Sequence, residues 1–333
     1  MTPFIANVLL SALSTIATTP QVEPDPALIA QLEQERPVAV GKNGADALYA
    51  IPQAPAGELT LFCNYDQADC LDAARENLAA YRAAAQQHKK AWQVQEKAIA
   101  ALRQYNHFRY TTTYEDPLPP YDRIFRQRIL TAYRFADGEK TAAIESLCTT
   151  TAVGLHLLNN DQNGLLSGAK AARLIEANAT MLAEMLAESP VDTRLSAICD
   201  EIKVQPAENL SLCPRMYDEW RAISDVLQKS MQEGLTIMPL TDAQIRELGI
   251  NFFPNTMLTS LINQAEAYAL QEFARPCSAE NQAAVARGEL PNLAPDSNIR
   301  AQNCGPYNGI CIVIEVWDNT RYQASLLNVN RYS

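Results

Sequence analysis

The sequence predicts a mainly α-helical fold: an antiparallel array or bundle of helices, stapled by disulfides, with a small β-hairpin or strand near the C-terminus. Apolar residues recur at helical spacing over most of the chain, which is the first observation behind this prediction. Glycine is scarce, at 12 of 333 residues, which disfavours turn-dense β folds and glycine-rich cofactor loops. The connections between apolar stripes are short, and short loops join helices that pack as antiparallel neighbours.

Composition and charge place the chain among globular proteins. Hydrophobic residues make up 47% and charged residues 20% of the sequence, which excludes global disorder. The net charge is −11, from 27 Lys and Arg against 38 Asp and Glu, so polyphosphate would repel the chain and no nucleic-acid partner is expected. No apolar run reaches about 18 residues, so no ordinary membrane-spanning helix is predicted.

The N-terminal segment has the length and character of a signal-peptide core. Residues 4–17 (FIANVLLSALSTIA) are apolar and uncharged, and Thr15-x-Ala17 offers small residues for cleavage. The usual Lys or Arg before such a core is missing, which leaves an unusual start codon or a short uncleaved anchor as alternatives. We therefore expect residues 1–17 to be a signal peptide or short anchor that associates with the membrane surface. A proline-rich linker follows at residues 18–26.

A helical domain is expected over residues 27–275, opening with a short helix at 25–35. Residues 69–105 are rich in Ala and Gln and predict one long or one broken helix. Residues 122–136 predict the next helix, which Gly138 ends. The later helical stripes are residues 144–158, 171–186, 195–202, 216–231 and 258–268.

The pattern changes in the C-terminal part, residues 276–333. The Ala-rich stretch 278–303 contains prolines and glycine and predicts a loop with one short helix. Residues 310–314 (ICIVI) are β-branched and predict a strand. Because a lone strand needs a partner, residues 322–329 are the candidate for the second strand of a hairpin.

Eight cysteines favour disulfides over a metal site. Their number is even, no CxxC is present, and His88, His107 and His156 lie beside no cysteine pair, so we expect neither metal nor cofactor. Disulfides would place the chain in an oxidising compartment, whereas the alternative is a set of buried free thiols. The disulfide candidates are Cys63, Cys70, Cys148, Cys199, Cys213, Cys277, Cys304 and Cys311.

The connectivity of eight cysteines cannot be deduced from sequence. Short loops favour Cys63 with Cys70, Cys199 with Cys213, and Cys304 with Cys311 or Cys277. Cys148 would then have a remote partner.

No sequence motif indicates a catalytic residue. The sequence has no G-x-S-x-G, no H-E-x-x-H and no phosphate loop. Cys148 and His156 are eight residues apart on one predicted helix, about 12 Å along its axis, which is too far for a catalytic pair. The stretch 159–164 resembles the start of a calcium loop, but Lys170 stands where a bidentate Glu is required, so a polar turn is the better interpretation.

One region combines basic and aromatic residues. Between Arg82 and Arg134 there are ten Lys and Arg and four Asp and Glu, a local charge of +6 that leaves −17 on the rest. Arginine with aromatic faces can hold an anionic or glycan-like ligand, and residues 110–121 predict a proline-rich loop between two helices, where binding residues often lie. The alternative is that the charges are solvated and the aromatics form core. The candidate ligand-binding residues are Arg109, Tyr110, Tyr114, Tyr121, Arg123, Arg126 and Arg128.

Several short stretches carry a family resemblance. They are Asn43-Gly44-Ala45-Asp46-Ala47-Leu48-Tyr49, Phe62-Cys63, Cys70-Leu71, Leu78-Ala79-Ala80-Tyr81-Arg82 and Phe252-Phe253-Pro254-Asn255-Thr256-Met257-Leu258. Together with the apolar N-terminal segment, they resemble a family of uncharacterised proteobacterial envelope proteins over roughly residues 22–275. The resemblance implies a membrane-targeting segment, an envelope location and an all-helical body. It carries no activity, so no catalytic residue is transferred.

These observations lead to an expectation about function. We expect a protein of the Gram-negative envelope, in the periplasm or anchored facing it, that acts as a non-enzymatic binding or scaffold protein. Its partner would be an envelope protein or an anionic or glycan ligand. The alternative is a hydrolase that cleaves an envelope or cell-wall polymer with paired carboxylates.

Overall fold

The computed structural model describes residues 23–35, 38–55, 59, 70–110, 119–160, 165–189, 197–202, 207–232, 255–293 and 297–304. These residues are mainly helical, as predicted, and among them the only β pairing is an isolated bridge between Asn43 and His107. The candidate strands at 310–314 and 322–329, the segment 1–17, Tyr114, Cys63 and Cys311 lie outside the described residues.

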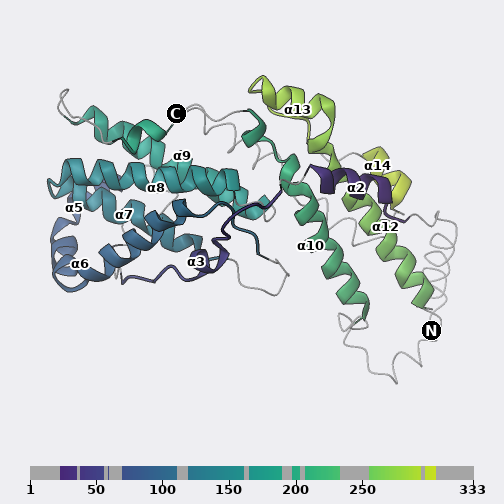
Figure 1. Cartoon of the computed structure of the whole chain (residues 1–333), viewed down its shortest axis with the longest axis horizontal. Helices are drawn as coiled ribbons and strands as arrows, with labels where there is room; N and C mark the ends of the chain where they lie inside the picture. Colours follow the sequence, from purple (N-terminus) through teal and green to yellow (C-terminus); the bar gives the residue numbers. More distant parts are fainter. Residues whose placement is uncertain are drawn as a thin grey trace, which may run out of the picture.

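The helices form two neighbouring groups (Figure 1). In the first group, α8 packs along both α7 and α9, and α5 and α6 pack on α7. In the second group, α10 packs along α12, and α2, from the start of the chain, lies across both. The first group comprises α3 (Ala45–Tyr49), α5 (Cys70–Glu76), α6 (Leu78–Ala101), α7 (Tyr121–Ala136), α8 (Lys140–Asn160) and α9 (Leu165–Ala187). The second comprises α2 (Pro26–Gln34), α10 (Cys213–Gln232), α12 (Asn255–Ala274), α13 (Ala279–Ala286) and α14 (Ser297–Asn303).

The buried apolar residues form two clusters, of which one runs through both groups and the other lies among α5 to α9. The cluster that runs through both groups contains Ile175 of α9, Met216 of α10 and Tyr268 of α12, all fully buried. The close approach of α8 and α9 requires a small residue at Gly154, because a Cβ there would meet the Ile175 side chain at 3.0 Å.

Local sequence explains where the helices begin and end. The carboxylate of Asp25 accepts a hydrogen bond from the Ala27 amide at 2.9 Å and caps α2, whose first residue is proline. The α7 helix ends at Ala136, and Gly138 follows with φ of 98°, a left-handed conformation that glycine adopts without strain.

Most predicted helices are confirmed, and two segments differ from the prediction. The 69–105 stretch takes the broken form of the two that were predicted. The break lies at Asn77, whose side-chain amide donates to the Ala73 carbonyl at 2.8 Å and so takes up a carbonyl at the end of α5. The 278–303 stretch holds two helices instead of one. The Ser278 hydroxyl accepts from the Asn281 amide at 3.3 Å and caps α13. Of the predicted 195–202 stripe, the described part holds a single short turn, Cys199–Glu201.

Two disulfides connect elements that are distant in sequence. Cys148 of α8 bonds Cys199, at a sequence separation of 51 residues and with Cα atoms 5.0 Å apart. Cys213, at the start of α10, bonds Cys277 just after α12, with Cα atoms 4.8 Å apart. The predicted pairs Cys199–Cys213 and Cys277–Cys304 are therefore wrong, while the remote partner expected for Cys148 is confirmed.

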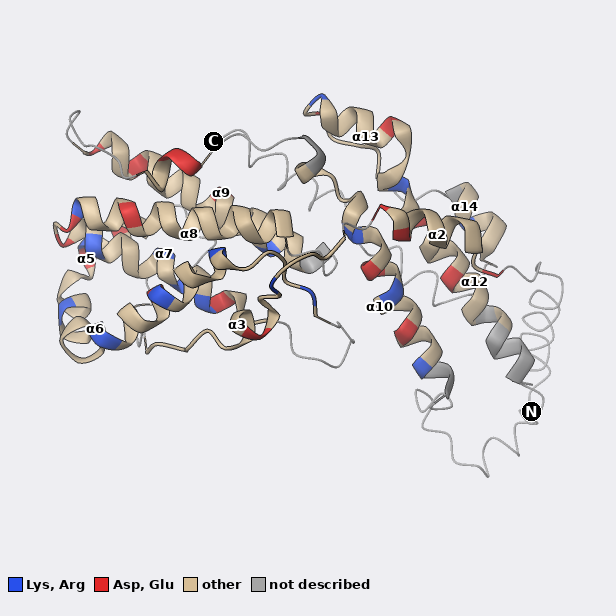
Figure 2. Ribbon diagram, viewed as in Figure 1, with Lys and Arg blue, Asp and Glu red and all other residues tan. Residues whose placement is uncertain are grey.

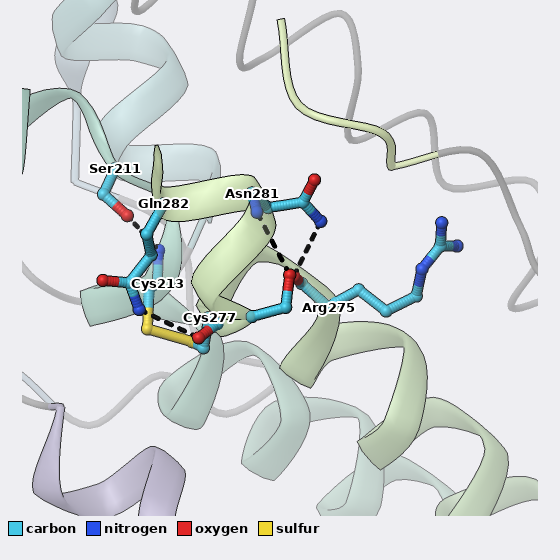
Figure 3. Close-up of a disulfide and its surroundings, with 7 residues drawn as sticks. Ser211, Cys213, Arg275, Cys277, Asn281 and Gln282 are labelled. Carbon is cyan, nitrogen blue, oxygen red and sulfur yellow. Dashed lines mark hydrogen bonds between the residues drawn. A yellow bond between two sulfur atoms is a disulfide. The ribbon is translucent and has the colours of Figure 1, made fainter. Parts of the chain in front are cut away.

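The second disulfide organises the helices around it. The Gln282 side chain of α13 donates to the Cys277 carbonyl at 2.9 Å, and the Asn281 side chain donates to the Arg275 carbonyl at the same distance (Figure 3). These bonds hold α13 against the linkage between α10 and α12. Cys70 and Cys304 are disulfide-bonded as well.

Among the described residues, no helix is both long enough and apolar enough to cross a membrane.

Candidate functional site: a tyrosine and lysine cluster

Three tyrosines and one lysine meet at the end of the first helix group. Tyr49 ends α3, Tyr110 follows the extended segment after α6, Tyr121 opens α7, and Lys170 lies in the first turns of α9. Tyr121 is buried, whereas Tyr49, Tyr110 and Lys170 are half-buried and keep part of their surface in solvent. Four separate elements therefore build one partly open cluster.

A network between two chain segments fixes the position of Tyr110. The Asn43 side chain donates to the Arg109 carbonyl at 2.7 Å and accepts from the Arg109 amide at 3.1 Å. The same carboxamide oxygen accepts from the Ala45 amide at 3.0 Å, where α3 begins. Gly44 lies so close to the Phe108 ring that a Cβ would meet it at 2.5 Å. The hydrogen bonds of the Asn43 side chain and the close packing of Gly44 therefore hold Tyr110 beside α3.

The geometry of the rings links the three tyrosines. The Tyr49 and Tyr110 ring centroids are 5.6 Å apart in an edge-to-face arrangement at 81°. The hydroxyl oxygens of Tyr110 and Tyr121 are 3.4 Å apart, and either one can donate. The Lys170 ammonium lies 5.5 Å from the Tyr121 ring centroid, within the range of a cation–π interaction.

Lys170 carries the positive charge of this cluster. No carboxylate among the described residues forms an ion pair with it, so the charge is opposed only by the face of a tyrosine ring. The sequence analysis did not predict Lys170 or Tyr49 as ligand-binding residues. Lys170 appeared there only as the residue that makes a calcium loop unsuitable, and Tyr49 only within a stretch that carries the family resemblance. The available signal for Lys170 was its position beside Ala171 and Leu174 of an apolar stripe, which places a charge at the edge of a packed face.

The structure brings together part of the predicted ligand-binding set. Tyr110 and Tyr121 belong to the cluster, with their hydroxyl groups in contact. Arg109 adjoins the cluster, because its backbone amide donates to the Asn43 side chain. Tyr114 lies outside the described residues.

The three α7 arginines of the predicted ligand-binding set make contacts elsewhere. Arg123 donates to the Ile51 carbonyl, and Arg126 pairs with Asp122 on its own helix at 3.4 Å. Arg128 is only 2% exposed and donates to the Ala177 carbonyl at 3.2 Å and the Cys70 sulfur at 3.4 Å. Burial lowers the pKa of the Arg128 guanidinium, with the Glu184 charge acting in the opposite direction. Arg128 is therefore a core residue that cannot reach a ligand at the surface.

His156 is half-buried and lies between two hydrogen-bonding neighbours. Its Nε2 lies 2.7 Å from the Tyr105 carbonyl and its Nδ1 lies 3.2 Å from the Asn160 side-chain amide. A neutral ring that donates from Nε2 and accepts at Nδ1 satisfies both contacts. Burial lowers the pKa of His156 and outweighs the Tyr105 carbonyl, which acts in the opposite direction, so the neutral ring is favoured. The expectation that His156 forms no catalytic pair with Cys148 agrees with the disulfide of Cys148.

Two carboxylates, the half-buried Glu96 and the buried Glu266, act as clamps between helices. Glu96 of α6 accepts two hydrogen bonds from Arg134 of α7, at 3.0 and 3.1 Å, and one from Ser146 of α8 at 2.5 Å. Glu266 of α12 accepts from Ser224 of α10 at 2.6 Å. Among the described residues, no group of three or more His, Cys, Asp or Glu side chains is placed to hold a metal ion.

No family model, curated protein or solved structure matches this chain. What the cluster can do follows from its chemistry. Tyrosine rings offer flat apolar faces and hydroxyl groups, and a lysine without an ion pair attracts a carboxylate or phosphate. Together they suit a ligand that has a ring face and a negative charge.

Proposed function

We propose that this chain is a non-enzymatic binding protein of the Gram-negative cell envelope, and that the cluster of Tyr49, Tyr110, Tyr121 and Lys170 binds an anionic, glycan-like ligand. The observation that carries the proposal is the Lys170 ammonium, which lies over the Tyr121 ring with no carboxylate of the described residues paired to it. A sugar ring stacks on the exposed part of a tyrosine, and its acidic group binds the ammonium.

The location is proposed on separate grounds. Disulfides such as Cys148–Cys199 and Cys213–Cys277 persist in oxidising compartments, of which the periplasm is one. The apolar segment 4–17 supports export, as a signal peptide or short anchor. Residues 310–314 and 322–329 are proposed to add the small β-hairpin at the C-terminal end.

The alternative, a hydrolase with paired carboxylates, is not favoured by any observation on the described residues. The half-buried Glu96 and the buried Glu266 accept hydrogen bonds from neighbouring helices, which is a structural use of a carboxylate. A binding role remains the better proposal.

Calorimetric titration of the full chain with glucose, glucuronate and glucose 6-phosphate tests the proposal. We expect the two anionic sugars to bind and glucose to bind more weakly, because only the anions use Lys170. The variant Lys170→Gln should weaken binding of the anions about tenfold, the size of one charge-assisted hydrogen bond.

Lys140→Gln is the matched control. Lys140 also lies over an aromatic ring, with its ammonium 5.1 Å from the Phe135 centroid, but it belongs to the start of α8 and not to the cluster. Equal loss of affinity in the two variants, or no heat of binding with any of the three sugars, would overturn the proposal.

A further inference from the structure

The α6 helix packs on the protein by one face only. Tyr81, Trp92, Gln95 and Ile99 are its buried residues. The Tyr81 ring stacks between Trp92 and Tyr133, at centroid distances of 5.8 and 5.3 Å, and the Trp92 indole donates to the Pro55 carbonyl at 2.6 Å. These contacts fix the orientation of a 24-residue helix about 36 Å long.

The opposite face of α6 is open to solvent and contains no acidic residue. The single acid of this helix, Glu96, turns inward to Arg134. Val94 is 58% exposed and is the one large apolar side chain on the outer face. The residues of this outer face are Ala83, Gln86, Gln87, Lys90, Gln93, Val94, Lys97 and Ala101, all exposed.

Several basic residues lie along α6 (Figure 2). On its flank, Arg82 pairs with Asp137 at 2.7 Å and Lys89 approaches Glu139 at 3.8 Å. Lys90 and Lys97 lie seven residues apart, hence on one side of the helix and about 10 Å from each other along the axis.

Neither Lys90 nor Lys97 forms an ion pair with a described carboxylate. In a chain of net charge −11, this face is therefore a local site for an anion.

We infer that the outer face of α6 binds the surface of an anionic lipid bilayer. A straight helix with lysine and glutamine side chains presents several donors to a flat layer of phosphates at once. A partner protein would need buried aromatic or aliphatic anchors at the centre of its interface, and this face offers short alanines and a single valine. The acidic remainder of the chain is repelled by the same surface, which orients the molecule with α6 toward the lipid.

Vesicle sedimentation with the full chain tests this inference. The probes are vesicles of phosphatidylethanolamine with phosphatidylglycerol, and vesicles of phosphatidylcholine alone. We expect salt-sensitive binding to the anionic vesicles, and the pair of variants Lys90→Gln and Lys97→Gln to weaken it about 25-fold, at about fivefold for each lysine. Glutamine is a good helix former, so α6 should remain folded.

The matched control removes two cations elsewhere, with Arg221→Gln and Arg287→Gln. Arg221 is exposed on α10 and Arg287 is exposed just after α13, both in the second helix group (Figure 1). Equal loss in both double variants, salt-insensitive binding, equal binding to phosphatidylcholine, or stronger binding to soluble polyglutamate than to vesicles would overturn the inference. Lys170→Gln should leave vesicle binding unchanged, so a failure of the sugar site does not affect this result.

Discussion

At the scale of single residues, His156 shows how burial sets a protonation state. Its neutral ring joins α8 to the Tyr105 carbonyl, and burial lowers its pKa below that of an exposed histidine, about 6.5. The unfolded chain therefore binds a proton at this residue more readily than the folded chain. The stability that results is present above about pH 6.5 and is lost as the pH falls through the folded-state pKa.

Replacing His156 with glutamine should remove this share of the pH dependence. We expect urea unfolding of the natural chain to show a steeper loss of stability from about pH 7 to pH 5 than the variant shows. At pH 7 the variant should lose about 1 kcal/mol, because the hydrogen bonds are not fully replaced. His88→Gln controls for the removal of a histidine. Identical pH profiles for the natural chain and His156→Gln would contradict this account.

Residues also show why the site was predicted only in part. Arg128 was counted with its basic neighbours, but it lies three residues after Phe125 and four before Ala132, on the apolar stripe of α7. Helical spacing therefore indicated that Arg128 faces the core, whereas a count of charges could not. Lys170 was missed because its partner, Tyr121, is distant in sequence, and no local pattern reports which helix packs beside it.

At the scale of elements, polar clamps determine how α6 sits on α7 and α8. Burial lowers the pKa of Arg134, but the hydrogen bonds and charge of Glu96 outweigh burial, so the pKa is raised overall. The Arg134 side chain is 11% exposed, so its charge depends on Glu96 for compensation.

Glu96→Gln tests this dependence by equilibrium unfolding in urea. We expect it to lower the free energy of unfolding by about 2 kcal/mol, less than for a fully buried pair because the Glu96 side chain is 27% exposed. The matched variant Glu188→Gln breaks the exposed pair with Arg75 and should cost less than about 1 kcal/mol. A cost for Glu96→Gln no larger than that for Glu188→Gln would show that the clamp contributes little.

The helices themselves were well predicted because each buries a stripe of regular spacing. The pairing of the cysteines was predicted poorly, because it depends on which elements lie next to each other in the folded chain. Loop length favoured Cys199 with Cys213, yet packing places Cys199 against α8 and Cys213 against the end of α12. A single sequence shows the spacing of apolar residues along each helix. It does not show which helices pack beside each other.

At the scale of the whole molecule, one of two hydrophobic clusters connects the two helix groups, and disulfides join elements that are distant in sequence. The first group contains both the tyrosine and lysine cluster and the basic face of α6, while most of the acidic charge lies elsewhere in the chain. A helical frame joined by disulfides, with the proposed ligand cluster and the proposed lipid-binding face of α6, suits the proposed binding protein of the envelope. Export to an oxidising compartment is the condition on which this account depends.

The intact mass of the protein from its native cell, before and after reduction, tests that condition most directly. We expect a mass that lacks about the first 17 residues and rises by about two daltons for each disulfide on reduction. A full-length mass that reduction does not change would contradict export and disulfide formation together, and with them the proposed place of this protein in the envelope.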